Sequence, residues 1–260
     1  MFNWRKSAAK LLDDGETICL IHITKTQGST PRDADTVMLV SAEKTYGTIG
    51  GGNLEYAAVG AARDCLKNNM QAMTLDYILG PDVEQCCGGR VELSLQKITR
   101  RSELPDMPFP QFPPVFVFGA GHVGQAVSAA LSPLPFAVRL YDNRNDKIIG
   151  EVLSYSHGQD AISSAPKNTY FLIMTHDHSL DYELVSAVLK RGDFAFLGLI
   201  GSKTKKARFM SRLKKHGFAE AQLSRLTCPI GIERIQGKEP EIIAASVAAQ
   251  LLQIRTTNGD

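Results

Sequence analysis

Short apolar runs alternate with longer amphipathic segments in the second half of the chain. Four such runs predict buried strands, at residues 114–118, 136–142, 169–175 and 194–201. Apolar residues recur at helical spacing in four other segments, at 125–132, 179–192, 202–217 and 239–255. Within 179–192, the residues that share one helical face are Leu180, Leu184, Val185 and Val188, and Gly192 is suited to end the helix. Strands that alternate with helices predict a Rossmann-like, doubly wound parallel sheet.

The first half of the chain has a mixed pattern. Its strand-like runs are 17–24, a hairpin over 38–50, and two strands around 72–79 and 90–98. Two helices are predicted, at 2–15 and 53–69. In the first helix the inward residues are Trp4, Ala8, Leu11 and Leu12, and Gly15 follows its end. We therefore expect an N-terminal α+β domain over residues 1–103.

Proline marks the boundary between the two halves. Residues 104–114 hold five of the twelve prolines in the chain. Proline fixes φ, lacks an amide donor and forces its predecessor into extended geometry. This segment therefore predicts a stiff linker, with the Rossmann-like domain over residues 115–260.

Composition narrows the class of protein. The 260 residues are 43% hydrophobic and carry a formal net charge of +2, so no bulk basic field favours a nucleic-acid partner. No apolar run is long enough to span a bilayer, and the N-terminus has no export-signal pattern. Five cysteines are an odd number without such a signal, which favours reduced thiols in the cytoplasm. We expect a cytoplasmic protein with no membrane partner.

A glycine-rich turn gives the clearest chemical signal. The sequence Gly119-Ala-Gly121-His122-Val-Gly124 follows a predicted strand and opens a predicted helix, and Asp142 ends the next strand. Such a turn lets a phosphate approach free amides at a helix N-terminus, and the acid can accept hydrogen bonds from ribose hydroxyls. The pattern identifies the shape of a ligand rather than a reaction, and a turn that has lost its ligand is the alternative.

A second loop in the same sheet repeats this logic. Gly201-Ser202-Lys203 lies between a strand and a basic helix, and it offers amides, a hydroxyl and positive charge for a second phosphate. A solvated basic helix face explains the lysines equally well. The sequence leaves both alternatives open.

The run Thr175-His176-Asp177-His178-Ser179-Leu180-Asp181 looks at first like a metal site. Zinc hydrolases with a similar motif need an acid at 180 and a histidine at 181, where this chain has Leu180 and Asp181. A third zinc ligand is also missing, with His122 the one histidine expected to come near. Because the run follows a parallel strand, His176, Asp177, His178 and Asp181 are expected to line a ligand crevice. An N-cap role for Asp177 or Ser179 is compatible with this.

Three glycine-containing stretches stand out in the first domain. Gly28-Ser-Thr-Pro-Arg32 is a loop. The turn of Gly50, Gly51 and Gly52 opens a helix. A need for positive φ explains that turn better than an anion-binding site does. The third stretch puts Cys86 and Cys87 before Gly88 and Gly89. A buried thiol is the usual interpretation, but a thiol on a flexible loop also suits a soft metal such as molybdenum. Cys19, Cys65 and Cys228 lie in packing contexts.

Together these stretches resemble the xanthine dehydrogenase accessory protein family of the XdhC/CoxI type, over nearly the whole chain. The motifs that carry the resemblance are GSTPR (28–32), GTIGGGNLE (47–55), CCGG (86–89), FGAGHVG (118–124), THDHSLDYEL (175–184), LGLIGSKTKKAR (197–208), CPIGI (228–232) and EPEIIAASVAAQLL (239–252). The chain departs from the family at Cys86, which adds a second thiol. It departs again at Asp142-Asn143, where the family has an acidic pair.

The resemblance implies an accessory protein rather than an enzyme. Family members bind molybdenum cofactor, protect it and pass it to a xanthine dehydrogenase-type molybdenum hydroxylase while a cysteine desulfurase adds the terminal sulfur. Cys87 matches the family cysteine and is expected to contact molybdenum. The expected partners are that hydroxylase, the desulfurase, cofactor biosynthesis proteins and a second copy in a homodimer. We also expect both domains to contact one cofactor, in its mononucleotide or dinucleotide form, with Gly50, Gly51, Gly52 and Gly88 among the contacts from the first domain.

Two other functions compete with this one. An NAD(P)-dependent oxidoreductase would use the same fingerprint to bind its dinucleotide and transfer hydride to a small substrate. No obvious catalytic Lys/Tyr or His/Asp pair accompanies the fingerprint. A redox-sensing or interaction module that only binds a nucleotide is the third alternative.

Overall fold

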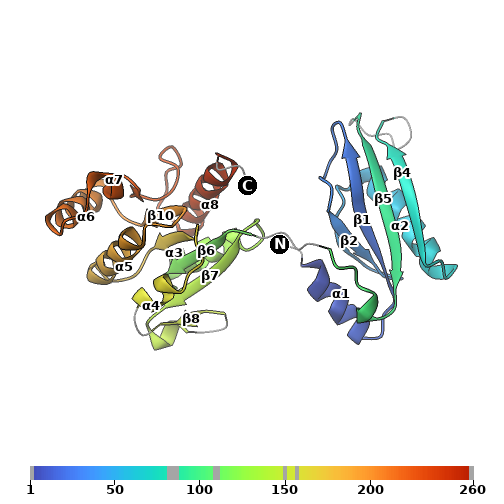
Figure 1. The fold of residues 1–260 in the computed structure, drawn as a ribbon, viewed down its shortest axis with the longest axis horizontal. Coiled ribbons are helices and arrows are strands. Elements are labelled where there is room, and N and C mark those ends of the chain that lie inside the picture. Colours follow the sequence, from blue (N-terminus) through green and yellow to red (C-terminus); the bar gives the residue numbers. More distant parts are fainter. Residues whose placement is uncertain (1–2, 81–87, 108–111, 149–150, 156–157, 258–260) are drawn as a thin grey trace. The chain divides into compact units, whose positions relative to one another are not determined.

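The chain forms two compact units that divide near residue 110 (Figure 1). A computed structural model describes residues 3–80, 88–107, 112–148, 151–155 and 158–257. Each unit has its own sheet and its own buried core.

The N-terminal unit is built on a five-stranded antiparallel sheet in the order β3-β2-β1-β5-β4. Its strands are β1 (Ile18–Gln27), β2 (Val37–Val40), β3 (Thr45–Gly47), β4 (Ala72–Ile78) and β5 (Arg90–Ile98). Side chains alternate across β1: Cys19 and Ile21 face α2 (Gly52–Lys67), whereas Ile18 and Leu20 face α1 (Trp4–Asp13). One helix therefore covers each face of this sheet, and a 3-10 turn, η1 (Arg101–Glu103), follows β5. The predicted α+β unit is confirmed.

The C-terminal unit is built on a six-stranded parallel sheet in the order β11-β10-β9-β6-β7-β8. Its strands are β6 (Pro114–Phe118), β7 (Ala137–Asp142), β8 (Leu153–Ser154), β9 (Tyr170–Ile173), β10 (Phe196–Leu199) and β11 (Leu226–Thr227). The chain starts in the centre with β6, adds β7 and β8 on one side, and then adds β9, β10 and β11 on the other. This is the order of a doubly wound Rossmann-like sheet, as the sequence predicted.

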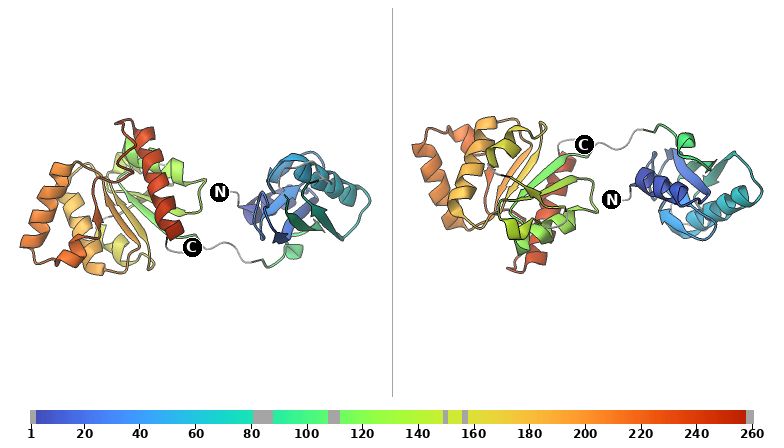
Figure 2. Two further views of the ribbon diagram at one scale, coloured as in Figure 1. Left: turned by 90° about the horizontal axis from the view of Figure 1, so that it is seen from above. Right: turned by 90° about the horizontal axis from the view of Figure 1, so that it is seen from below.

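Helices cover both faces of the parallel sheet (Figure 2). Val115 and Val117 point into the core shared with α3 (His122–Leu131) and α8 (Pro240–Thr257). Phe116 and Phe118 point into the opposite core, formed with α4 (Gly158–Ser163), α5 (His178–Arg191), α6 (Lys203–Lys215) and α7 (Glu220–Leu223). This buried packing on both faces fixes the loops at the carboxyl edge of the sheet.

Some elements differ from the sequence prediction. Four short elements, β8, α4, α7 and β11, and the 3-10 turns η1 and η2 (Asn145–Lys147) were not predicted, because two to six residues do not establish a hydrophobic period. The strand predicted over 114–118 has the bounds of β6, so Pro114, where the expected linker and strand overlap, belongs to the strand, in a position that proline tolerates. No helix within the described part of the chain is long and apolar enough to cross a bilayer.

Candidate ligand-binding site

Three of the predicted loops lie at the carboxyl edge of the parallel sheet. Gly119 follows β6, Thr175 follows β9 and Gly201 follows β10, and these strands are neighbours in the order β6-β9-β10. Strand order reverses between β6 and β9, which is where doubly wound sheets bind ligands. The first two loops touch: Met174 donates its amide to the carbonyl of Phe118 at 2.9 Å. The fold therefore brings these sequence motifs to one edge.

The glycine turn after β6 is closely packed at two positions and open at one. Gly119 has φ +114, and a Cβ there would lie 2.3 Å from the Met174 carbonyl oxygen. A Cβ on Gly124 would lie 1.7 Å from the Gly119 carbonyl oxygen. A Cβ on Gly121, at the N-cap of α3, would meet no atom within 4 Å. The turn thus leaves space for an anion over the helix N-terminus, beside the exposed His122.

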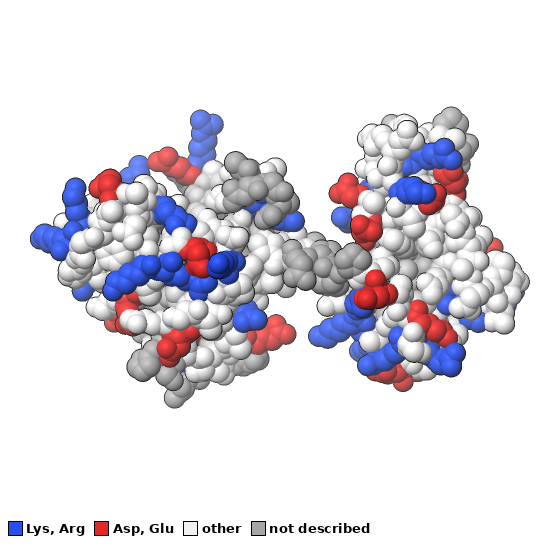
Figure 3. Space-filling model, viewed as in Figure 1, with Lys and Arg blue, Asp and Glu red and all other residues white. Residues whose placement is uncertain are grey.

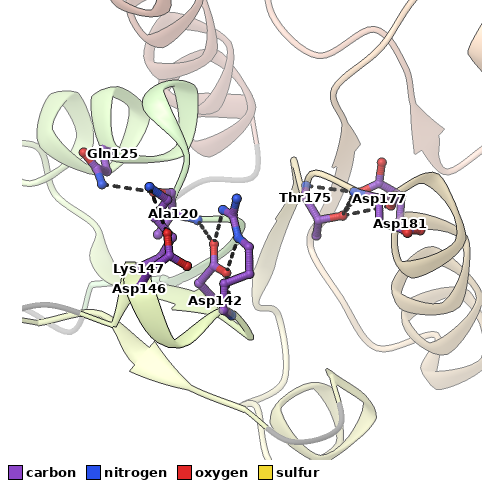
Figure 4. Close-up of polar contacts among 9 residues, drawn as sticks. Ala120, Gln125, Asp142, Asp146, Lys147, Thr175, Asp177 and Asp181 are labelled. Atoms are coloured by element: carbon purple, nitrogen blue, oxygen red, sulfur yellow. Dashed lines mark hydrogen bonds and ion pairs between the residues drawn. The ribbon is translucent and has the colours of Figure 1, made fainter.

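Asp142 is buried behind this turn rather than pointing freely into the crevice (Figure 4). Its Oδ2 accepts the Ala120 amide at 2.6 Å, and Arg144 donates its amide and guanidinium to the same carboxylate at 2.8–2.9 Å. Burial opposes ionisation, but these hydrogen bonds and the Arg144 charge outweigh it and lower the pKa of Asp142 to about 2. The carboxylate therefore anchors the glycine turn. Arg144, two residues along, was missed by sequence reasoning.

The run 175–181 is organised around two acids that already have partners. Asp177 caps α5 by accepting the amides of Ser179 and Leu180 at 2.6 and 3.0 Å, which confirms its N-cap role. Those bonds hold the pKa of Asp177 below its ordinary range. Asp181 is fully buried and accepts the amide and hydroxyl of Thr175 at 3.1 and 2.7 Å (Figure 4). Direct ligand contact by Asp181 would require its bonds to break, whereas both bonds of the exposed Asp177 go to Oδ1 and leave Oδ2 facing outward.

Lys205 joins this run to the next loop. Its Nζ lies 2.6 Å from Asp181 Oδ2 and donates to the carbonyl of Ile200 at 2.9 Å. Its side chain is 13% exposed, so this is a nearly buried ion pair. Ser202 caps α6 and accepts the Lys205 amide at 3.1 Å. The sequence shows Lys205 only as one lysine of a basic helix, and no spacing rule predicts its pairing with a residue 24 positions away.

A cavity of about 420 Å³ lies between the two loops. Its polar lining consists of Thr175, His176, His178, Ser202, Thr204, Lys205 and Arg208. No acidic side chain lines it, and Arg208 forms no ion pair within the described residues. His176 and His178 are exposed and flank its mouth. This cavity suits an anionic or hydrogen-bonding ligand, whereas Lys203 turns away and pairs with Glu233 at 3.1 Å.

No metal cluster arises in this region. Across the described residues, no group of three or more His, Cys, Asp and Glu side chains is arranged to hold a metal ion. In the 175–181 run, Asp181 pairs with Lys205 and accepts two bonds from Thr175, and Asp177 accepts two amides through Oδ1. The arrangement fits ligand binding through histidines, hydroxyls and cations.

The glycine-rich stretches of the N-terminal unit converge at one end of its sheet. A Cβ on Gly89 would lie 2.3 Å from the carbonyl oxygen of Ser29. A Cβ on Gly50 would lie 2.6 Å from Cβ of Pro31. The loops at 28–32, 50–52 and 88–89 thus meet, although their first glycines, Gly28, Gly50 and Gly88, are 22 to 60 positions apart in the sequence. Close backbone approach explains why glycine occupies these positions.

Glu55 organises the three-glycine turn. Its Oε2 accepts the amides of Ile49 and Gly51 at 3.0 and 3.1 Å, and Thr48 donates its hydroxyl to the same atom at 2.5 Å. Gly50, Gly51 and Gly52 all have positive φ, from +63° to +123°. The interpretation of this turn as a positive-φ loop is therefore confirmed. Glu55, visible in the motif GGGNLE, was not singled out.

The cysteines divide into two groups. Cys86 and Cys87 lie outside the described residues, so the expected molybdenum contact stays a prediction; Gly88 is described and exposed. Cys19, Cys65 and Cys228 are buried free thiols, as their packing contexts predicted. Burial raises the pKa of Cys19 to about 12, which leaves it an unreactive thiol.

Comparisons with known proteins agree across both units. A family model described as the XdhC Rossmann domain matches residues 115–251, and one described as the XdhC and CoxI family matches residues 11–77. The Escherichia coli (strain K12) protein YqeB, described as uncharacterized, is 26% identical over 261 residues, which cover 95% of this chain and 45% of YqeB. The chain thus spans less than half the length of that relative.

Two solved structures resemble the chain to different degrees. A Bacillus halodurans protein described as a xanthine dehydrogenase has a TM-score of 0.77 and 18% identity, covering 98% of this chain and 97% of its own. At that identity the similarity shows the fold alone. An imine reductase variant from Myxococcus stipitatus, in complex with NAD+, has a TM-score of 0.34 and 14% identity, covering 57% of this chain and 62% of its own.

Proposed function

The chain belongs to the XdhC and CoxI family, and we propose that it is a maturation chaperone for a molybdenum hydroxylase. In this proposal it binds molybdenum cofactor as cargo, protects it, and passes its sulfurated form to a xanthine dehydrogenase-type enzyme. The observation that carries the proposal is the open glycine turn at Gly121, beside a cavity lined by histidines, hydroxyls and Arg208.

The described residues suit the chemistry of this cargo. Molybdenum cofactor combines an anionic phosphate or nucleotide end with a pterin rich in hydrogen-bonding groups. We assign the phosphate to the amides at the start of α3, near Gly121 and His122. We assign the pterin edge to His176, His178 and Ser202. Asp142, Asp177 and Asp181 support these contacts by holding the loops in place.

The remaining assignments rest on the family and on sequence. Cys87, beside Gly88, is proposed to contact molybdenum or shield its sulfido ligand. The proposed partners are the client hydroxylase, a cysteine desulfurase, cofactor biosynthesis proteins and a second copy of the chain. The proposed compartment is the cytoplasm. In this account the chain transfers cargo and carries out no turnover of its own.

Equilibrium binding of purified molybdenum cofactor tests the proposal. Gly121→Asp places a carboxylate in the open space above α3. Because this carboxylate repels the phosphate, the substitution should weaken cofactor binding by about tenfold or more. Gly60→Asp is the matched control, since Gly60 is equally open but lies in the N-terminal unit. Cys87→Ser tests the metal contact separately.

Competition distinguishes the alternative function. NAD and NADP are added to the cofactor-loaded chain at increasing concentration. Weak or absent displacement is expected from the chaperone proposal. Tight NAD(P) binding without affinity for the pterin would instead support an oxidoreductase, and the proposal would be abandoned.

A further inference from the structure

A second cavity opens on the other side of the β10–α6 loop. Its volume is about 1020 Å³, compared with about 420 Å³ for the cavity beside His176. Gly201 and Ile200 line both, so one loop separates the two. Its other walls are residues 226–233 and 235–238, after α7, and four residues of α8, Ile242, Ile243, Ser246 and Gln250.

The wall formed by residues 228–238 is firmly held. Gly231 donates its amide to Gln250 Oε1 at 2.8 Å, and Gln250 Nε2 donates back to the Gly231 carbonyl at 3.2 Å. Ile232 donates its amide to Ser246 Oγ at 2.7 Å, and Ser246 is buried. Gly231 has φ +95, and a Cβ there would lie 2.6 Å from Ser246 Oγ. The cavity is therefore preformed by specific contacts with α8.

The lining combines exposed aliphatic surface with unpaired positive charge. Ile235 and Ile242 are 43% and 37% exposed, although large aliphatic side chains usually avoid water. The charged side chains are Lys203, Lys206, Lys238 and Glu233, which give a net charge of +2. Glu233 pairs with Lys203, and Lys206 and Lys238 form no ion pair within the described residues. Figure 3 shows lysines and arginines gathered at the edge of this unit, where Figure 1 labels α6.

We propose that this cavity binds a nucleoside monophosphate group. The aliphatic side chains of Ile230, Ile242 and Ile243 provide flat apolar surfaces for a base. Lys206 and the first amides of α6 provide the site for the phosphate. Lys206 lies on the first turn of α6 and lines this cavity but not the one beside His176. The neighbouring cavity is lined mainly by polar side chains, so the base is assigned to the aliphatic side.

This site is distinct from the glycine turn and does not depend on the identity of the proposed cargo. The group can be a free nucleotide or the tail of a larger ligand, because both present the same base and phosphate. Charge complementarity and the aliphatic walls favour it over a neutral ligand. The titration below distinguishes a nucleotide from inorganic phosphate alone as the occupant of the cavity.

Calorimetric titration of the full chain tests the site with adenosine, cytidine and guanosine monophosphates and with inorganic phosphate. Lys206→Gln should weaken nucleotide binding about tenfold, because a charged hydrogen bond is lost. Ile242→Asn should weaken nucleotide binding about fivefold and leave inorganic phosphate binding unchanged, because it removes apolar contact. Lys215→Gln on the same helix and Leu153→Asn, exposed elsewhere in the unit, are the matched controls.

The outcomes separate the site from the glycine turn. Nucleotide binding that survives Gly121→Asp but falls with Lys206→Gln supports the proposal. The same loss for NAD, which carries an adenosine monophosphate group within a larger molecule, identifies a tail, and a loss for monophosphates alone identifies a free nucleotide. Absent nucleotide binding, binding lost only in Gly121→Asp, or equal affinity for nucleotide and inorganic phosphate would each overturn it. Circular dichroism confirms that the variants remain folded.

Discussion

At the scale of single residues, the acids near the candidate site hold backbone in place. Asp142 accepts the Ala120 amide, Asp181 accepts the Thr175 amide, and Glu55 accepts two amides of its glycine turn. Both carboxylate oxygens of Asp142 and of Asp181 already have partners, so a hydrogen bond from a ligand hydroxyl would have to replace an existing one. The groups left to face a ligand are amides, histidines and cations. This favours anionic cargo.

Asp142→Asn should lower the free energy of unfolding by about 2 kcal/mol at neutral pH. The pKa of Asp142 falls from its ordinary 3.8 to about 2 in the folded chain. A depressed carboxyl pKa stabilises the fold above about pH 4, and that contribution disappears as the pH falls towards about 2. Urea unfolding of the wild type and of Asp142→Asn between pH 7 and pH 2 measures how their difference in free energy of unfolding changes with pH. A difference in stability that stays constant over that range would contradict it.

Two similar substitutions in the glycine turn should have very different effects on the stability of the fold. Gly124→Ala should cost about 3 kcal/mol, because its Cβ would overlap the Gly119 carbonyl. Gly121→Ala should be neutral or slightly stabilising, because its φ of −72° suits alanine and its Cβ would face open space. Thermal unfolding of the two variants measures the contrast. Equal destabilisation would show that the turn is packed differently.

At the scale of secondary-structure elements, two loops of the candidate site are joined by one nearly buried ion pair. Lys205 on α6 reaches Asp181 on α5, and Asp181 in turn holds Thr175 at the end of β9. This pair sets the spacing of the loops on either side of the cavity beside His176. Its role is positional, since neither charge is free for a ligand.

Lys205→Met should cost about 3 kcal/mol, because it leaves the Asp181 carboxylate buried without its cation. The double variant Lys205→Met/Asp181→Asn should recover part of that loss, since the unpaired charge is then removed. Chemical denaturation of the wild type, both single variants and the double variant gives the coupling energy. A cost below about 1 kcal/mol for Lys205→Met, typical of an exposed pair, would contradict the burial of this contact.

The elements with a clear period were predicted from sequence, and the contacts between them were not. The patterns at 53–69 and 179–192 correspond to α2 and α5, and Asp177 was recognised as a possible cap. Strand β11, with two residues, has no detectable pattern of its own. The pairing of Asp142 with Arg144 and of Asp181 with Lys205 depends on how the loops fold back, which no spacing rule specifies. The motifs located the site, whereas its geometry required the structure.

At the scale of the whole molecule, the chain contains two independent cores. The antiparallel sheet with α1 and α2 buries one set of apolar residues, and the parallel sheet buries another between its two helical layers. Leu104 and Met107 still pack on the N-terminal core, and Pro114 begins β6, so limited proteolysis should cleave first between Met107 and Pro114 and leave two folded fragments. Mass spectrometry with hydrogen exchange measures this. Early cleavage inside either sheet would contradict two separate cores.

Delivery of cofactor tests the central claim most directly. The measurement is the activation of a molybdenum-free xanthine dehydrogenase-type enzyme by sulfurated cofactor, supplied free or bound to the chain, with Gly121→Asp as the binding-deficient variant and Gly60→Asp as its control. We predict that cofactor bound to the wild type or to Gly60→Asp activates the enzyme to a higher level than free cofactor, and that Gly121→Asp gives no such gain. Equal activation with and without the chain would contradict the account.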